Sequence, residues 1–231
     1  MLRVRRWSLL GLAAGTAVLL AGCGAGATGV GGAGGSAAAR SAPGASSAGA
    51  AVPAGSPLHG TYVIVGASST ASYTAHETFL GTNSPFTPVG TTSSIQGDIV
   101  LQDGKIRPST IQVDLRTRKT DSAMRDHHIQ QTPLETATYP YATFALAGTA
   151  SPLIAEGQTV SLQVPGTMTI HGTSKPVTFA AQIAAQGQTL KVTGTAGFNF
   201  SYFNLQPPDI PGFVAVQQGL QIGLDVTATA G

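Results

Sequence analysis

The side chains best suited to chemistry in this chain of 231 residues gather between Lys119 and Phe144. This segment is dense in charged, imidazole and aromatic residues, and it contains Arg125 and Asp126 followed by two adjacent histidines. On a helix, Arg125 and Asp126 would point about 100° apart, so they cannot pair as residues four apart do. Each therefore needs a partner elsewhere, either a protein group that ties the segment in place or the head group of a ligand.

The histidines of the chain do not form a pattern typical of a metal site. His127 and His128 would fall on different faces of one helix, and no cysteine, histidine or carboxylate follows at a ligand-like interval. His59, His76 and His171 are isolated. The chain also lacks a Gly-x-Ser-x-Gly elbow, a glycine-rich phosphate loop and a close pair of carboxylates. We therefore expect no metal, no cofactor and no enzymatic activity.

A short helix is expected to position the charged side chains. Asp121 or Ser122 can act as the N-cap, and Pro133 stops the helix, which predicts a helix over about residues 121–131. A helix of about ten residues is marginal on its own. It must therefore pack against something larger, which the flanking sequence supplies as β-strands.

Apolar and polar residues alternate with period two over most of the chain, which predicts strands with one face turned inward. Turn signals such as Asp103-Gly104 and Glu156-Gly157 lie between these runs and favour hairpins. So many strands in one domain favour an all-β fold, an antiparallel barrel of about eight strands with the helix near its mouth. The clearest runs are 95–101, 111–115, 142–146, 160–170, 177–183, 190–200 and 220–228, with weaker ones at 62–65 and 72–79.

The interior of such a barrel has two possible states. Small residues occur at inward positions, namely Gly97, Ala142, Ala181, Gly194 and Ala196. They can interdigitate with larger side chains and fill the barrel, or they can leave room for one slender ligand. The alternation alone does not decide between the two.

The N-terminus is organised as an export signal. Three arginines precede an apolar stretch over residues 8–20, and small residues and Cys23 follow. The stretch is too short to span a membrane. A lone cysteine at this point favours a lipoprotein signal over residues 1–22, with Cys23 acylated as a membrane anchor, whereas an ordinary secretory signal is the alternative.

Residues 23–57 consist mainly of Ala, Gly, Ser and Pro, with Arg40 as the only charge. Such a composition cannot bury enough apolar surface to fold, so we predict a disordered tether and a folded domain over 58–231. Without the three signal arginines, nine Lys and Arg face ten Asp and Glu, so the mature chain is nearly neutral. Because no basic patch with interleaved aromatics is present, a nucleic-acid partner is not expected.

Two motifs resemble the YceI-like family. In the first, TRKTDSAMRDHHIQQTPLETATYPYATF, the matching positions are Thr120, Arg125, Asp126, His128, Ile129, Tyr139, Pro140 and Phe144. The second, GTMTIHGTSKPVTF over residues 166–179, is similar to the family's glycine-rich element that ends in Lys-Pro-Val. The two motifs occur in order, and the resemblance extends over about residues 58–230.

The resemblance implies a lipocalin-like barrel whose apolar interior binds a long isoprenoid lipid. Arg125, Asp126 and His128 would lie at the mouth, where they tie the helix or meet a head group. The acylated Cys23 would hold the protein on the outer side of the bacterial cytoplasmic membrane or in the cell envelope. Our pocket hypothesis comprises ten residues: Phe79, Ile99, Ile129, Phe144, Met168, Phe179, Ala181, Gly194, Phe198 and Phe200.

Residues 198–205 depart from the family pattern. Phe200, Tyr202 and Asn204 stand where the family usually has arginine, aspartate and glycine. The missing charges are either a lost ion pair or a sign of a more apolar pocket, which would suit an uncharged quinone or polyprenol better than a diphosphate. An alternative function is a surface lipoprotein with a filled barrel, whose loops 80–92 and 206–218 dock an envelope protein that the sequence does not identify.

Overall fold

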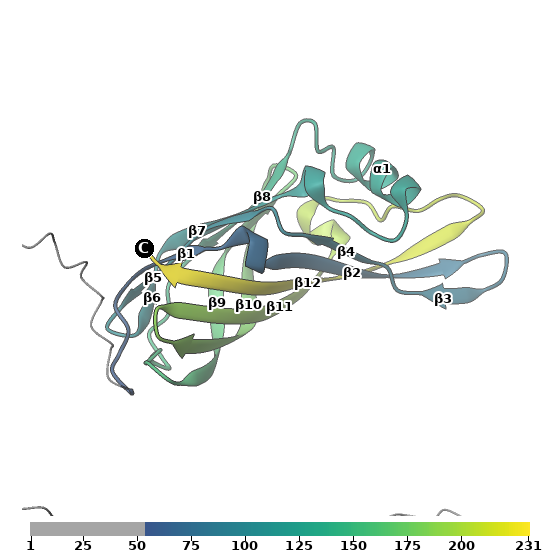
Figure 1. Cartoon of the computed structure of the whole chain (residues 1–231). Helices are drawn as coiled ribbons and strands as arrows, with labels where there is room; N and C mark the ends of the chain where they lie inside the picture. Colours follow the sequence, from purple (N-terminus) through teal and green to yellow (C-terminus); the bar gives the residue numbers. More distant parts are fainter. Residues whose placement is uncertain (1–53) are drawn as a thin grey trace, which may run out of the picture. The chain divides into compact units, whose positions relative to one another are not determined.

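The antiparallel barrel predicted from the sequence is confirmed by the computed structural model, which describes residues 54–231 (Figure 1). Besides the strands, the described part contains α1 (Ala123–Gln131) and three 3₁₀ turns, η1 (Gly66–Ser68), η2 (Leu115–Thr117) and η3 (Phe200–Phe203). The strands are β1 (Gly60–Ile64), β2 (Thr70–Phe79), β3 (Ser84–Phe86), β4 (Val89–Thr92), β5 (Ile95–Gln102), β6 (Lys105–Arg107), β7 (Ser109–Asp114), β8 (Tyr141–Leu146), β9 (Thr159–Ile170), β10 (Thr173–Gln186), β11 (Thr189–Asn199) and β12 (Val214–Ala230).

The sheet closes on itself through β12, which is the longest strand. Hydrogen-bonded neighbours follow the order β1-β5-β7-β8-β9-β10-β11-β12, and β12 pairs back with β1. This ring contains eight strands, as predicted. β2 continues the line of β1 along β12, because Ala228 pairs with Ile64 and Asp225 pairs with Thr70.

β10 shows how the alternating pattern builds the wall. Val177, Phe179, Ala181 and Ile183 are buried, whereas the residues between them are exposed. Successive side chains of a strand point to opposite faces, so one face of β10 joins the core and the other meets solvent. The short strands β3, β4 and β6 were not predicted, because three or four residues are too few to show alternation.

The helix forms where the capping residue was predicted. The Ser122 side chain accepts a hydrogen bond of 3.3 Å from the backbone N–H of Arg125, which satisfies one free donor of the first turn. Asp126 and Ile129 are the buried residues of α1, whereas Met124 is 78 % exposed. Figure 1 shows α1 lying over one end of the barrel. None of the helices in residues 54–231 has the length and apolarity needed to cross a membrane.

The other end of the barrel is filled by side chains. Ile183, Leu190 and Val226 are at most 1 % exposed there. Ile154, from the loop between β8 and β9, covers this end, and its N–H donates to the carbonyl of Gly104 at 2.7 Å. This half of the interior has the packed state that the sequence left as one of two possibilities.

Contacts with the barrel begin within the last residues of the predicted tether. The N–H of Gly55 donates to the carbonyl of Glu156, and the N–H of Leu58 donates to that of Ile154. Both contacts lie at the filled end. The predicted signal peptide, Cys23 and residues up to 53 lie outside the described residues.

Position 97 requires glycine because of its backbone conformation, and not because the barrel interior needs space there. Its φ is +130°, and a Cβ placed there would lie 2.2 Å from the carbonyl oxygen of Thr110. Gly194 differs, because the nearest atom to its Cβ position is 3.6 Å away on Phe179. Only glycine therefore fits position 97, whereas position 194 has room for a side chain.

A three-stranded projection extends beyond the barrel at the helix end (Figure 1). Past Glu77, β2 pairs with β3 on one side and with the first residues of β12 on the other, where Phe79 pairs with both Ser84 and Val214. The N–H of Leu80 also donates to the carbonyl of Phe213 at 2.9 Å. We call this projection, residues 78–87 and 210–216, the tongue.

Candidate functional site

An apolar cavity of about 130 Å³ lies inside the barrel at the helix end. For comparison, an apolar protein cavity of about 150 Å³ binds benzene. Three alanines, Ala71, Ala75 and Ala142, are among its lining residues and reduce the side-chain volume there. The larger apolar lining residues are Ile111, Val113, Leu115, Ile129, Pro133, Leu134, Phe144, Met168, Ile170, Phe179, Phe200, Leu205, Pro208, Leu220, Ile222 and Leu224.

Five of the ten predicted pocket residues line this cavity: Ile129, Phe144, Met168, Phe179 and Phe200. They come from α1, β8, β9, β10 and η3, so only the closed barrel brings them together. The rings of Phe144 and Phe179 meet edge to face, with centroids 4.9 Å apart. Contact between these five residues and a ligand stays a prediction.

The other five predicted residues lie away from the cavity. Ile99 and Ala181 are buried in the packed core, and Gly194 pairs with Ala181 across β10 and β11. Phe198 packs on Phe203 instead, with ring centroids 4.8 Å apart. Phe79 is 38 % exposed on the tongue, because β2 has already left the barrel at that point. Alternation predicts which face a residue occupies, but not its height along the barrel.

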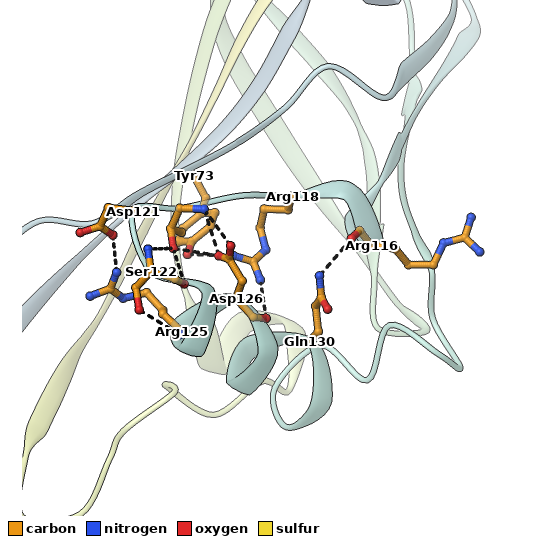
Figure 2. A network of polar contacts seen from close by, with 9 residues as sticks. Tyr73, Arg116, Arg118, Asp121, Ser122, Arg125, Asp126 and Gln130 are labelled. Atoms are coloured by element: carbon orange, nitrogen blue, oxygen red, sulfur yellow. Dashed lines mark hydrogen bonds and ion pairs between the residues drawn. The ribbon is translucent and has the colours of Figure 1, made fainter.

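A buried ion pair joins α1 to the chain segment that precedes it (Figure 2). Nη1 of Arg118 donates to Oδ1 of Asp126 at 3.3 Å, and Nη2 donates to the backbone carbonyl of Asp126. The Asp126 carboxylate also accepts from the backbone N–H and the hydroxyl of Thr120, at 2.9 and 2.8 Å. Arg118 and Asp126 are 4 % and 6 % exposed, so each needs the other's charge.

Arg125 joins the same helix to the base of the tongue. Its Nη2 lies 3.3 Å from Oε2 of Glu77 on β2, and its Nη1 donates to Asp121, as Figure 2 shows for the latter pair. The guanidinium also lies over the ring of Phe86 on β3, 5.2 Å from the centroid. Arg125 therefore contacts β2 and β3 together and holds α1 beside the tongue.

The polar end of the cavity is balanced in charge. Glu77, Arg118, Tyr73 and Thr92 are among the lining residues. Arg118 pairs with Asp126, and Glu77 pairs with Arg125, so the two cations meet two buried carboxylates. Burial raises the pKa of Tyr73, whose hydroxyl lies 3.3 Å from Nη1 of Arg118. Within the described residues, the buried Nε of Arg118 has no hydrogen-bond partner.

His128 stands apart from this network, although the sequence grouped it with Arg125 and Asp126. Its side chain is half-buried, it is not among the cavity-lining residues, and its Nε2 has no hydrogen-bond partner in the described part of the chain. Arg125 contacts Glu77 of β2, and Asp126 contacts Arg118 and Thr120 in the segment before α1, so both hold the helix in place. A role for His128 at the mouth stays a prediction.

Glu77 and Arg118 were not predicted as site residues from the sequence. A signal for Glu77 was available, because it follows Ala71, Tyr73 and Ala75 at the inward positions of β2, where a carboxylate needs a buried partner. Arg118 carries no such signal. It lies between η2 and α1, and only the tertiary structure buries it.

The segment that departs from the family pattern forms η3 and the residue after it. Phe200, at the position usually held by arginine, is buried and lines the cavity. The hydroxyl of Tyr202 donates to the carbonyl of Pro176 at 2.9 Å on the surface. Asn204 has φ +58°, the left-handed conformation that glycine would also adopt. The replacement of arginine therefore extends the apolar wall.

The closed barrel of eight antiparallel strands, with an apolar cavity under a short helix, defines a class of β-barrels with a hollow interior. Within this class, a family model described as the YceI-like domain matches residues 62–228. The chain therefore belongs to the YceI-like family.

Known relatives agree with this membership. A UPF0312 protein of Pseudomonas putida (strain W619) is 33 % identical over 141 residues, which cover 59 % of this chain and 71 % of the relative. The protein YceI of Escherichia coli (strain UMN026) is 30 % identical over 112 residues, covering 47 % of this chain and 56 % of the relative.

Two solved structures share the fold. A polyisoprenoid binding domain from Saccharophagus degradans superposes with a TM-score of 0.59 at 15 % identity, covering 74 % of this chain and 98 % of that one. BcnA of Burkholderia cenocepacia gives 0.57 at 22 % identity, with 72 % and 99 % covered. At these identities the likeness concerns the fold alone.

Proposed function

We propose that this chain is an envelope-tethered lipid-binding protein that holds or ferries a long isoprenoid in its barrel. The observation that carries the proposal is the apolar cavity at the helix end, with its charge-balanced polar end. Family membership supports it, as does the structural neighbour from Saccharophagus degradans, which is described as a polyisoprenoid binding domain. The role is binding and not catalysis, and no cofactor is part of it.

The size of the cavity limits how such a ligand is held. A volume of about 130 Å³ takes only part of a long chain, so loading must separate lining side chains or leave part of the lipid outside. Each buried CH₂ contributes about 0.8 kcal/mol, so a few isoprene units bind through apolar burial alone. Phe144, Met168 and Phe179 are the residues we expect to move apart.

The polar end favours an uncharged head group. The buried Arg118 is paired with Asp126, and the partly buried Arg125 is paired with Glu77, so neither guanidinium is left to meet the negative charge of a diphosphate. Arg118 lines the cavity, and its Nε is a buried donor without a partner in the described residues. When loading separates the lining side chains, this N–H can donate to the carbonyl of a quinone or to the hydroxyl of a polyprenol. Phe200, in place of the family's arginine, also favours an uncharged ligand.

The proposal places the protein on the outer side of the cytoplasmic membrane or elsewhere in the cell envelope. In this proposal, residues 1–22 are a lipoprotein signal, Cys23 is the acylated residue, and residues 23–57 are the tether. This part of the proposal rests on the sequence.

Substitution at the cavity tests the proposal. Ala142→Phe puts a ring into the cavity and should abolish lipid recovery with little change in melting temperature, because the ring occupies space that the lipid would use. Ala185→Phe is the matched control, since Ala185 pairs with Leu190 at the filled end, where a ring overpacks the core and should cost about 1 to 3 kcal/mol while leaving the cavity open.

Native mass spectrometry with lipid extraction, on protein purified from its own host, provides the measurement. Recovery of an isoprenoid from the parent and from Ala185→Phe, but not from Ala142→Phe, is the expected result. If the parent protein never yields a lipid, the interaction lipoprotein becomes the better explanation.

A further inference from the structure

The tongue exposes large apolar side chains beside the cavity. Phe213 is 72 % exposed, Leu80 49 % and Phe79 38 %, and Phe86 is half-buried under the guanidinium of Arg125. The rings of Phe79 and Phe86 lie with centroids 5.7 Å apart, so they form one surface. Single exposed apolar residues are common on protein surfaces, whereas a cluster of them indicates a binding surface.

The tongue also carries no charge. Residues 78–97 and 210–224 contain no Asp, Glu, Lys, Arg or His. A surface made for a protein partner usually combines aromatic anchors with arginine and a polar rim that selects the partner. An uncharged apolar tip instead suits the interior of a lipid bilayer, where each charge would have to be desolvated at a cost.

The tongue starts where the cavity ends. Glu77, the last residue of β2 before the tongue, lines the cavity and pairs with Phe86 across β2 and β3. Val216, the last tongue residue on β12, pairs with Glu77 as well. Arg125 binds Glu77 and covers Phe86, so the helix over the cavity and the tongue are held together. A surface that binds the tongue therefore lies next to the cavity.

We propose that the tongue docks on a lipid bilayer by inserting Phe213, Leu80 and Phe79, which brings the cavity to the pool of apolar lipids. The inference rests on the proposed lipid-binding function, since a cavity for a water-insoluble chain must be loaded from a membrane. Because the tip is uncharged, the docking needs no anionic lipid and is insensitive to salt.

The anchor proposed at Cys23 permits this orientation. The described chain starts at the filled end, where Gly55 meets Glu156, whereas the tongue lies at the start of β12. β12 has 17 residues and so spans about 55 Å. The roughly 30 residues between Cys23 and Ala54 reach about 100 Å when extended, which is enough for the tongue end to turn toward the same membrane.

Tryptophan fluorescence can test the insertion directly. Trp7, the only tryptophan, lies in the proposed signal segment, so the mature chain over residues 23–231 carrying Cys23→Ser has no apolar signal segment, no acyl anchor and no intrinsic indole. Into this background we would introduce Phe213→Trp at the tongue or, as a control, Leu153→Trp, which replaces a 43 % exposed residue at the filled end. The probe is a vesicle of uncharged phosphatidylcholine, with and without bromine on its acyl chains.

We expect the indole at position 213 to shift its emission to the blue and to be quenched by brominated lipid, while that at position 153 does neither. Raising NaCl from about 0.1 M to about 1 M should leave the quenching unchanged. Equal quenching at both positions, or none at position 213, would overturn the proposal.

A pair of double variants measures the contribution of the side chains. Leu80→Ser with Phe213→Ser should lower co-sedimentation with the same vesicles about tenfold, whereas Val63→Ser with Leu153→Ser, at surface positions of the filled end, should not. Unchanged melting temperatures show that all variants fold. If light scattering instead shows a dimer that only the tongue variant dissociates, and no vesicle binding is seen, the tongue binds a second copy and the proposal fails.

Lipid extraction separates this inference from the proposed function. Isoprenoid recovered from the parent, without tongue insertion, would refute the docking and leave the lipid-binding proposal standing. Tongue insertion without any recovered isoprenoid would refute lipid carriage and still support a bilayer contact.

Discussion

At the scale of single residues, the pair of Arg118 and Asp126 is the part of the site most sensitive to change. Both side chains are almost fully buried, and the carboxylate is also the acceptor for Thr120. Asp126→Ala leaves the arginine charge buried without a partner, which should lower the free energy of unfolding by about 3 to 5 kcal/mol. Urea denaturation provides the measurement.

Asp121→Ala is the matched control for this pair. Asp121 also binds an arginine, Arg125, but its side chain is 61 % exposed, and Arg125 keeps Glu77 as a partner. The loss should stay below about 1 kcal/mol. Equal losses in the two variants would mean that burial does not set the strength of the network at the cavity.

Because Tyr73 is partly buried, we expect the stability of the fold to depend on pH in the alkaline range. Burial raises its pKa above the ordinary value of 10.0. The folded chain therefore keeps this proton after the unfolded chain has lost it, so the contribution to stability is complete below about pH 10 and is lost as the pH rises through the raised pKa.

Tyr73→Phe should reduce this alkaline loss, at a cost near neutral pH of about 1 kcal/mol for the missing hydrogen bond to Arg118. Urea denaturation at about pH 9 and about pH 11 tests both effects. Tyr202→Phe, on an exposed ring, is the control. An identical pH profile for parent and Tyr73→Phe would contradict the assignment.

At the scale of the elements, the close approach of β5 to β7 depends on one glycine. Gly97→Ala would force a Cβ against the carbonyl of Thr110 and would strain a φ of +130°, so we expect a loss of about 2 to 4 kcal/mol. Gly194→Ala has room beside Phe179 and should change stability by less than about 1 kcal/mol. The measurement is thermal unfolding of both variants, and similar melting temperatures would show that β5 and β7 can move apart at this point without loss of stability.

At the scale of the whole molecule, anchor and tongue would act together on one membrane. If Cys23 is acylated, Cys23→Ser should move most of the protein to the aqueous fraction after washing, because the tongue contact alone is reversible. Adding Leu80→Ser and Phe213→Ser should remove the remainder. Membrane fractionation of the parent and the two variants measures this, and full retention of Cys23→Ser on membranes would exclude the anchor.

The class of fold and the local features that build it could be predicted from the amino-acid sequence. Period-two alternation predicted the barrel strands, and Ser122 and Pro133 predicted the helix within two residues of its observed ends. These signals are readable because each depends on neighbours in the chain, whether through the alternation of strand faces or through a capping hydrogen bond.

The position of the cavity in the barrel and the contacts that hold the helix over it became visible only in the folded chain. Alternation placed Ile99 and Ala181 inside but could not say that they belong to the packed core and not to the cavity wall, nor that β2 leaves the barrel before Phe79. The partner of Arg125, Glu77, lies 48 positions away, and Arg118 gained its role from burial alone. Strand register and barrel closure set these contacts, and both depend on pairings between segments distant in the chain.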